Sequence, residues 1–207
     1  MLIIEYRIMS KDFWDKRYLE QEFAYGIKPN EFLKSEIGKL KPGKALFLGE
    51  GEGRNSVYAA KLGWQVDAVD YSSSAKLKAL RLAEENNVVI NYTVENFENY
   101  QFLKNQYHLV VMIFLHLPSH INQTIFEGSI ESLKAGGKLI IETFSKGQLN
   151  NSSGGPKDPA LLFSETELLK FTSKLNIEFI ESKSIILDEG PYHKGKADVV
   201  RFIGVKE

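Results

Sequence analysis

The sequence contains no cysteine among its 207 residues. Disulfide bonds and cysteine-ligated metal sites are therefore excluded, and the composition suits a reducing compartment, for which we predict the cytoplasm. No apolar run approaches the roughly 20 residues that span a bilayer. The segment from Met1 to Met9 carries Glu5 and Arg7 and is not followed by a small-residue cleavage site. We therefore expect no membrane partner.

Neither sign of charge dominates the chain. Its 26 Lys and Arg residues nearly balance 27 Asp and Glu residues, for a formal net charge of −1. This balance gives no reason to expect nucleic acid as a partner. The length suits one domain with a substantial core. We predict a single domain over residues 1–207 that acts on a small molecule as a monomer or weak homodimer.

One stretch near the first quarter of the chain organises the rest. The apolar run 45–48 predicts a buried strand, and glycines follow it at alternate positions, namely Gly49, Gly51 and Gly53. Glycines permit a tight turn and a close approach to a ligand, and a helix that begins near Asn55 would direct free N–H groups at that ligand. A second apolar run ends at Asp70, about 20 residues later, where an acid can hydrogen-bond a ribose. The pattern predicts half of a nucleotide-binding α/β unit.

Predicted strands alternate with helices through five units, and two further strands follow. The expected strands are 45–48, 65–70, 88–94, 109–114, 138–144, 177–187 and 197–205. This order predicts a Rossmann-like, doubly wound, mostly parallel seven-stranded sheet with helices on both faces and a C-terminal antiparallel hairpin. We divide the domain into N-terminal helices over the cofactor cleft (1–43), a cofactor-binding core (44–144) and a closing part (145–207).

Two local expectations concern the surfaces of this fold. The helix after Ser72 should run to about Asn86, with its inward face formed by Leu77, Leu80, Leu82 and Ala83. The segment 147–159 is rich in glycine, serine and asparagine and has no periodicity, which is typical of a lid or a disordered loop.

The residues of the glycine turn indicate which nucleotide binds. The dinucleotide fingerprint requires a third glycine at position 54, where this chain has Arg54. Glu50 and Glu52 would repel a pyrophosphate but suit a cation. S-adenosylmethionine has positive sulfonium and ammonium groups and no phosphate, so it fits better than a dinucleotide.

With these residues the chain resembles the class I S-adenosylmethionine-dependent methyltransferases, and within them the branch of tellurite-resistance methyltransferase-like proteins. The resemblance covers nearly the whole chain. The motifs that carry it are Trp14-Asp15-Lys16-Arg17-Tyr18, Tyr25-Gly26 with Pro29-Asn30, the run from Gly49 to Asn55, Asp70-Tyr71-Ser72, the run from Phe114 to Pro118, Gly154-Gly155-Pro156 and the run from Glu189 to Gly195.

The resemblance implies a cofactor site. The three glycines would contact the methionyl part and Asp70 the ribose hydroxyls. Tyr71 would pack on the adenine, Met112 would lie beneath the reacting end, and the adenine amino edge would be surrounded by Glu95, Asn96 and Phe97. We also assign Asn55 to this site. Tyr18 and Tyr25 would close over the cofactor carboxylate, with simple packing as the alternative.

One departure from the family pattern concerns the methionine end of the cofactor. The family usually has an acid two residues before the first glycine, where this chain has Phe47. We suggest that Glu50 supplies the carboxylate for the ammonium group instead; the alternative is a solvated carboxylate in the turn.

Candidate acceptor-side residues lie after the first strand, after the fourth strand and between the last two. His116 is the candidate catalytic base, with a backbone-bonded histidine as the alternative. Arg54 would attract an anionic acceptor or form a surface ion pair. Tyr192 and His193 would touch the acceptor or only decorate a hairpin tip. His116 and His120 have a metal-ligand spacing, but Pro118 and Ser119 interrupt any shared helix and no third ligand is evident, so we expect no metal.

These observations predict methyl transfer from S-adenosylmethionine to a small acceptor. Tellurite as that acceptor is only what the resemblance implies. A thiolate or an oxyanion of tellurium or selenium would need no base, whereas an alcohol or an amine would use His116. A nicotinamide-dependent Rossmann oxidoreductase is one alternative, against which Arg54 and the two carboxylates of the turn weigh. A non-catalytic S-adenosylmethionine-binding module is the other, and Phe47 gives it some support.

Overall fold

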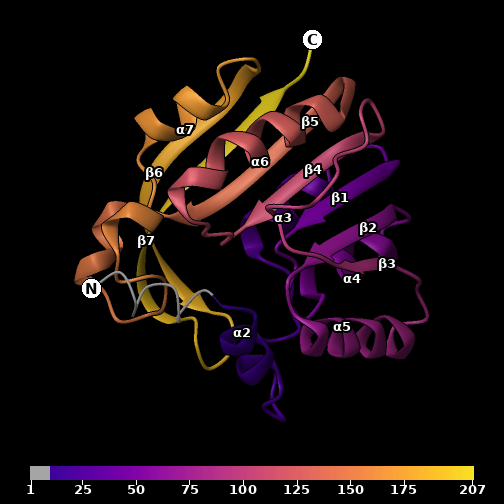
Figure 1. Cartoon of the computed structure of the whole chain (residues 1–207), viewed down its shortest axis with the longest axis vertical. Coiled ribbons are helices and arrows are strands. Elements are labelled where there is room, and N and C mark those ends of the chain that lie inside the picture. The colour runs from indigo at the N-terminus through magenta and orange to yellow at the C-terminus, as the bar shows by residue number, and fades with distance from the viewer. Residues whose placement is uncertain (1–9) are drawn as a thin grey trace.

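The computed structural model describes residues 10–207 and contains one seven-stranded sheet in the order β3-β2-β1-β4-β5-β7-β6 (Figure 1). The strands are β1 (Lys44–Leu48), β2 (Gln65–Asp70), β3 (Asn91–Val94), β4 (Tyr107–Ile113), β5 (Leu133–Phe144), β6 (Asn176–Asp188) and β7 (Lys194–Val205). The first five are mutually parallel, whereas β7 runs antiparallel to both β5 and β6. The predicted fold class, including the C-terminal hairpin, is confirmed. Residues 1–9, which begin the predicted segment 1–43, lie outside the described part.

Helices cover both faces of the sheet. They are α2 (Lys11–Tyr18), α3 (Glu31–Ile37), α4 (Arg54–Lys61), α5 (Ser73–Glu85), α6 (Ser119–Ser132) and α7 (Glu165–Phe171), with short 3₁₀ turns η1 (Lys146–Asn150) and η2 (Pro159–Leu161). One face packs on α3, α4 and α5, and the other packs on α6 and α7. Figure 1 shows α6 in front of β4 and β5. Strands buried on both faces are continuously apolar, which is why the sequence pattern revealed them.

Capping side chains determine where the helices begin. The Ser72 hydroxyl accepts a hydrogen bond from the Ala75 amide at 3.1 Å. Ser164 and Glu167 form a reciprocal capping box at the start of α7. Such caps satisfy amide groups that have no partner within the helix.

The prediction for the inward face of α5 was wrong in part. Leu77 is 72% exposed and Leu80 is 39% exposed, whereas the buried residues are Ala75, Ala79, Leu82 and Ala83. The helix turns its small residues inward because the backbone at Gly53 packs against Ala79. A leucine face would have held the helix farther from this loop.

The glycine-rich segment 147–159 is ordered rather than disordered. Gln148 is fully buried; its amide nitrogen donates to the Ser153 hydroxyl at 3.0 Å, and its side-chain oxygen accepts from the Asp198 amide at 2.9 Å. These bonds tie the segment to β7, so lack of periodicity here reflects irregular packing. Its function as a lid stays a prediction, as does the division of the domain into three parts.

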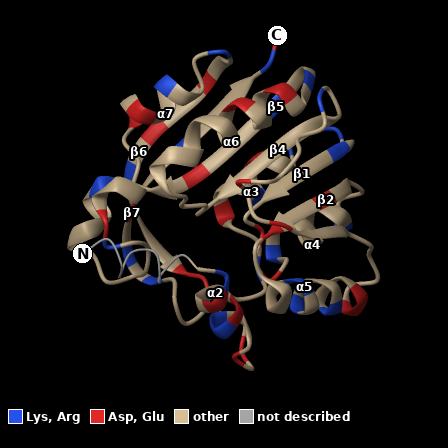
Figure 2. Cartoon of the chain, in the orientation of Figure 1, with Lys and Arg blue, Asp and Glu red and all other residues tan. Residues whose placement is uncertain are grey.

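Charge is mixed over the surface of the described chain. Figure 2 shows basic and acidic residues together on α5 and on α7. Within residues 10–207, no helix combines the length and apolarity needed to cross a bilayer. The cytoplasmic location and the oligomeric state stay predictions.

Candidate active site

The loop between β1 and α4 depends on glycine at three positions. Gly49, Gly51 and Gly53 have φ angles of 66°, 61° and 90°, respectively, which side chains with a Cβ rarely adopt. A Cβ on Gly51 would lie 2.9 Å from the Tyr18 hydroxyl oxygen, and one on Gly53 would lie 2.7 Å from the Cβ of Ala79. Both the backbone conformation and the close packing therefore require glycine.

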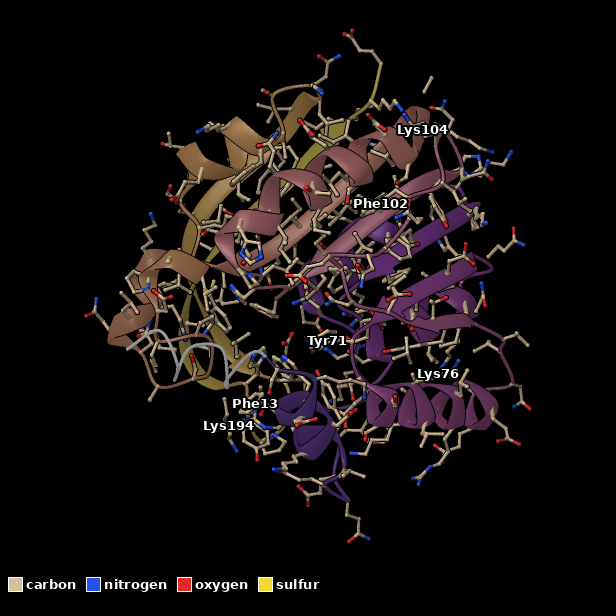
Figure 3. The ribbon with its side chains drawn as sticks, viewed as in Figure 1. Phe13, Tyr71, Lys76, Phe102, Lys104 and Lys194 are labelled. Carbon is tan, nitrogen blue, oxygen red and sulfur yellow. The ribbon has the colours of Figure 1, made fainter. Side chains whose placement is uncertain are left out.

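The sheet topology brings the predicted cofactor residues to one edge. Leu48 of β1 is level with Val69 of β2 and with Met112 of β4, so the loops after these strands are neighbours. The strand order reverses between β1 and β4, which is where ligands bind in such sheets. Figure 3 shows Phe13, Tyr71 and Lys194 toward this end of the molecule and Lys104 toward the other.

Asp70 ends β2 beneath the glycine loop. Its carboxylate accepts hydrogen bonds from the Gly51 amide and the Ser72 amide, each at 2.9 Å. The residue is 7% exposed, and this burial raises the pKa of its carboxyl. The Tyr71 amide also hydrogen-bonds this carboxylate. Two carboxylate oxygens offer about four acceptor positions, so Asp70 can still accept from a ribose hydroxyl.

Glu50 lies at the amino end of α4. Its Oε1 accepts from the Asn55 amide at 3.0 Å and from the Ser56 amide at 2.6 Å. Burial raises the pKa of Glu50 to about 7, although these bonds act in the opposite direction. The alternative of a solvated turn carboxylate is wrong, since Glu50 is 8% exposed. Its role toward the cofactor ammonium stays a prediction.

The nearby acid in the same turn, Glu52, has a structural role. It forms an ion pair with Lys78 at 2.7 Å and accepts from the Ala24 amide at 2.7 Å. Glu52 therefore holds the N-terminal segment against α5. Its charge is already paired, so the expectation that both turn carboxylates attract a cation applies to Glu50 alone.

The residues predicted around the adenine differ in exposure. Phe97 is 5% exposed and belongs to the apolar cluster under α6, as does Met112, which is 3% exposed and is predicted beneath the reacting end of the cofactor instead. Glu95 and Asn96 are half-buried, and Glu95 accepts a hydrogen bond from the Asn96 amide at 2.9 Å. Tyr71 is half-buried directly after Asp70. Their contacts with the adenine stay predictions.

The β6–β7 turn folds against the N-terminal segment. The rings of His193 and Tyr25 have centroids 4.4 Å apart, and Phe114, after β4, lies 4.7 Å from His193. The guanidinium of Arg17 lies 3.7 Å from the centre of the Tyr192 ring. His193 is buried, so it does more than decorate a hairpin tip. Three separate segments thus meet beside the glycine loop.

Two predicted residues have buried polar atoms without a hydrogen-bond partner among residues 10–207. Arg54 is 7% exposed; its Nη2 pairs with Glu189 Oε2 at 3.0 Å, and its Nη1 is unpaired. A surface ion pair was the alternative for Arg54, and its burial contradicts that. The Nδ1 of His116 lies 2.7 Å from the Leu161 carbonyl oxygen, and its Nε2 is unpaired.

A buried polar network beside this site was missed from the sequence. Asn30 donates to Glu142 at 2.6 Å and to Glu189 at 3.1 Å, and Arg201 donates to the other oxygen of Glu142. The Nδ1 of His193 lies 3.4 Å from Glu189. Against the effect of burial, the hydrogen bond from His193 and the charge of Arg54 lower the pKa of Glu189 to about 2. Glu189 and Asn30 occur in motifs that carry the resemblance, but nothing local indicated that they meet.

No group of three or more histidine and carboxylate side chains that could hold a metal ion occurs in the part of the chain from Ser10 onward.

Solved structures share this fold. TehB from Haemophilus influenzae superposes with a TM-score of 0.71 at 20% identity, over 95% of this chain and 67% of that chain. Phosphoethanolamine N-methyltransferase 2 from Haemonchus contortus superposes with a TM-score of 0.65 at 18% identity, over 98% of this chain and 59% of that chain. The fold is that of the class I methyltransferases.

Sequence comparison identifies the family. The model of the family described as tellurite resistance protein TehB matches residues 6–189, and the chain belongs to this family. Phosphoethanolamine N-methyltransferase 2 from Caenorhabditis elegans is 30% identical over 128 residues, which is 59% of this chain and 29% of that relative. The chain thus spans less than a third of that curated relative. The resemblance to S-adenosylmethionine-dependent methyltransferases of the TehB branch is confirmed, and the nicotinamide-dependent alternative is set aside.

Proposed function

We propose that this methyltransferase transfers the methyl group of S-adenosylmethionine to a small acceptor that carries an anionic group, such as a thiol with an acidic substituent or a chalcogen oxyanion like tellurite. The observation that carries the acceptor class is the unpaired Nη1 of Arg54, buried beside the glycine loop. The other guanidinium nitrogen, Nη2, is engaged by Glu189.

The carboxylates of the site fit the cofactor. Neither Glu50 nor Asp70 forms an ion pair with a residue in the range 10–207, yet both are more than nine-tenths buried. Buried carboxylates without an ion-pair partner favour a positively charged ligand, because its charge offsets their loss of hydration. The cofactor brings such a charge, and its sulfonium carries an activated methyl group. We assign its ribose to Asp70 and its ammonium to Glu50.

The protein's own task is to align the acceptor and to exclude water. Alignment of two reactants is worth about 7–11 kcal/mol at the limit. Tyr25 and His193 enclose the site from the N-terminal segment and from the β6–β7 turn. A buried Nη1 without a partner costs free energy that an anionic group on the acceptor would recover. Such a group would thereby orient the acceptor.

The test is calorimetric titration with S-adenosylhomocysteine, followed by a turnover screen. The screen pairs small thiols with and without a carboxylate, adds tellurite and selenite, and includes phosphoethanolamine because the nematode relative is named for it. We expect Arg54→Gln to raise the KM for anionic acceptors about 10–100-fold, with little effect on acceptors that lack the anionic group. The matched control is Arg81→Gln on the surface of α5.

Two results would count against the proposal. Tight binding of S-adenosylhomocysteine with no turnover of any acceptor would favour the non-catalytic module. Equal effects of Arg54→Gln on charged and uncharged acceptors would remove Arg54 from acceptor recognition while leaving methyl transfer in place.

A further inference from the structure

The segment after β4 passes directly over the cofactor loop. A Cβ on Gly49 would lie 2.6 Å from the Cδ1 of Leu115, so Leu115 contacts the first glycine of the loop. His116 is the next residue. Its ring stacks on Phe144, with centroids 5.6 Å apart and an angle of 14° between the planes. Phe144 in turn lies 5.3 Å from the His193 ring. His116 therefore belongs to the wall between the cofactor loop and the β6–β7 turn.

The hydrogen bond of His116 determines its tautomer. A carbonyl oxygen can only accept, so Nδ1, 2.7 Å from the Leu161 oxygen, is the nitrogen that carries the proton. In the neutral ring Nε2 then has a free lone pair. This atom is buried and has no partner among residues 10–207. In a histidine with a purely structural role, both ring nitrogens would be expected to have hydrogen-bond partners, because buried polar atoms are normally paired.

The surroundings also keep the ring neutral. Burial lowers the pKa of His116 to about 4; the nearby His193 acts in the same direction, and the bond to Leu161 acts against them. Phe144 and Leu161 bring no charge. Near neutral pH, Nε2 is therefore unprotonated and can accept a hydrogen bond or a proton from a ligand.

We propose that Nε2 of His116 takes the proton from the methyl acceptor, and that the acceptor is therefore a protic nucleophile, namely a thiol, an alcohol or an amine. This inference rests on the proposed methyl transfer and narrows its acceptor class. In an oxyanion such as tellurite the chalcogen atom attacks through its own lone pair and carries no hydrogen, so formation of its bond to the methyl carbon would leave Nε2 unused.

Methyl transfer and proton removal occur together. The acceptor atom X of X–H forms a bond to the methyl carbon while the bond from that carbon to the sulfonium sulfur breaks, and its electron pair stays on sulfur. The X–H proton passes to Nε2, which gives an imidazolium that later releases the proton to solvent. Because X–H becomes far more acidic as the X–C bond forms, a weakly basic imidazole suffices.

The experiment uses acceptors whose own ionisation decides whether a base is needed. A series of small thiols that carry a carboxylate, with thiol pKa values from below to above the assay pH, is assayed with the full chain, His116→Gln and His120→Gln. His120 is exposed and bonds to Glu98, so it is the matched control. We expect His116→Gln to lose about 10²–10⁴-fold in kcat/KM with protonated acceptors. Thiols that are already ionised should lose much less, and His120→Gln should resemble the wild type.

A second measurement does not depend on turnover. Nitrogen-15 NMR of the histidine rings should show His116 as the neutral tautomer with the proton on Nδ1 at pH 7, identified by the loss of its signals in His116→Gln. A proton on Nε2 would overturn the inference; if His116→Gln does not fold, the loss of the signals in His116→Asn makes the assignment.

The turnover outcomes separate this inference from the function on which it rests. Equal losses with ionised and protonated thiols, or no loss with either, would overturn the role of His116. Turnover of tellurite or selenite but of no protic acceptor would overturn the inference and keep methyl transfer. Turnover of no acceptor at all would overturn the proposed function itself.

Discussion

The Nη2 of Arg54 lies 3.0 Å from Glu189 Oε2, and the two side chains are 8% and 12% exposed. This buried ion pair joins the loop at the start of α4 to the β6–β7 turn, which carries Tyr192 and His193. The pair therefore links the predicted cofactor side of the site to the predicted acceptor side through residues 135 positions apart.

Removal of one partner of this pair should be more harmful than removal of both. We expect Glu189→Ala to lower the free energy of unfolding by about 3–5 kcal/mol, because it leaves the buried Arg54 without its counter-ion. The double variant with Arg54→Ala should recover part of that loss. Denaturant unfolding of the full cycle measures the coupling. The control is the exposed pair Arg81–Glu85, 67% and 53% exposed, where Glu85→Ala should cost less than about 0.5 kcal/mol.

Asp70 should be required for cofactor affinity. Asp70→Asn retains one acceptor oxygen but loses the charge and the second acceptor for the ribose, so we expect affinity for S-adenosylhomocysteine to fall about 10–100-fold. Calorimetric titration measures this. Asp67→Asn on the same strand is the control, because Asp67 pairs with Lys44 at 2.9 Å away from the loop. Unchanged affinity in Asp70→Asn would remove Asp70 from the cofactor site.

A comparison of two glycines separates backbone strain from close packing. Gly51 and Gly136 both have positive φ, 61° and 75°. A Cβ on Gly51 would meet Tyr18, whereas one on Gly136 would meet nothing within 4 Å. Gly136→Ala should therefore lower the free energy of unfolding by only about 1 kcal/mol, which is the cost of holding alanine at a positive φ. Gly51→Ala should cost more and abolish binding of S-adenosylhomocysteine. Thermal unfolding and titration measure both, and equal costs would contradict a packing role for Gly51.

The buried Glu50 should make stability depend on pH in a defined direction. Its pKa is raised from 4.5 to about 7 in the folded protein, so its contribution to stability is fully present below pH 4.5 and is lost as the pH rises through 7. We expect Glu50→Gln to gain stability relative to the wild type between pH 5 and pH 8, by at most about 3 kcal/mol. Unfolding at several pH values measures the difference. A stability difference that does not change with pH would show that the pKa of Glu50 is not raised in the folded protein.

The apolar residue at position 47 should not be replaceable by the family's usual acid. Phe47 is fully buried in the apolar cluster with α3 and α4. Phe47→Asp would bury a carboxyl without a partner and should cost more than about 4 kcal/mol. Phe47→Leu, the control, should keep S-adenosylhomocysteine binding, since leucine also suits the apolar cluster in which this side chain packs. Tighter binding in Phe47→Asp would contradict the substitution of Glu50 for the missing acid.

Local chemistry explains why much of the fold could be predicted. Some features depend only on residues close together in the sequence, so the sequence pattern predicts their structure directly. They are the apolar run of β1, the glycines after it and the caps at Ser72 and Ser164. Asp70 and Gly51 lie 19 positions apart within one strand–helix–strand unit, and their proximity follows from the right-handed connection of parallel strands. The inward face of α5 could not be predicted, because it depends on the distance of closest approach at Gly53.

The sequence by itself determined the class of fold, the glycine loop after β1 and the residues at the carboxyl ends of the strands, because periodicity, glycine spacing and strand polarity are local properties. Only the tertiary structure decided which side chains share buried partners. Asn30 meets Glu142 and Glu189 across 112 and 159 positions, and the lone pair on His116 is defined by a carbonyl 45 positions away. Such pairings depend on how the N-terminal segment and the last hairpin close over the sheet. Burial removes water as a hydrogen-bond partner, so the tertiary structure decides which polar atoms are paired by the protein and which are left for a ligand.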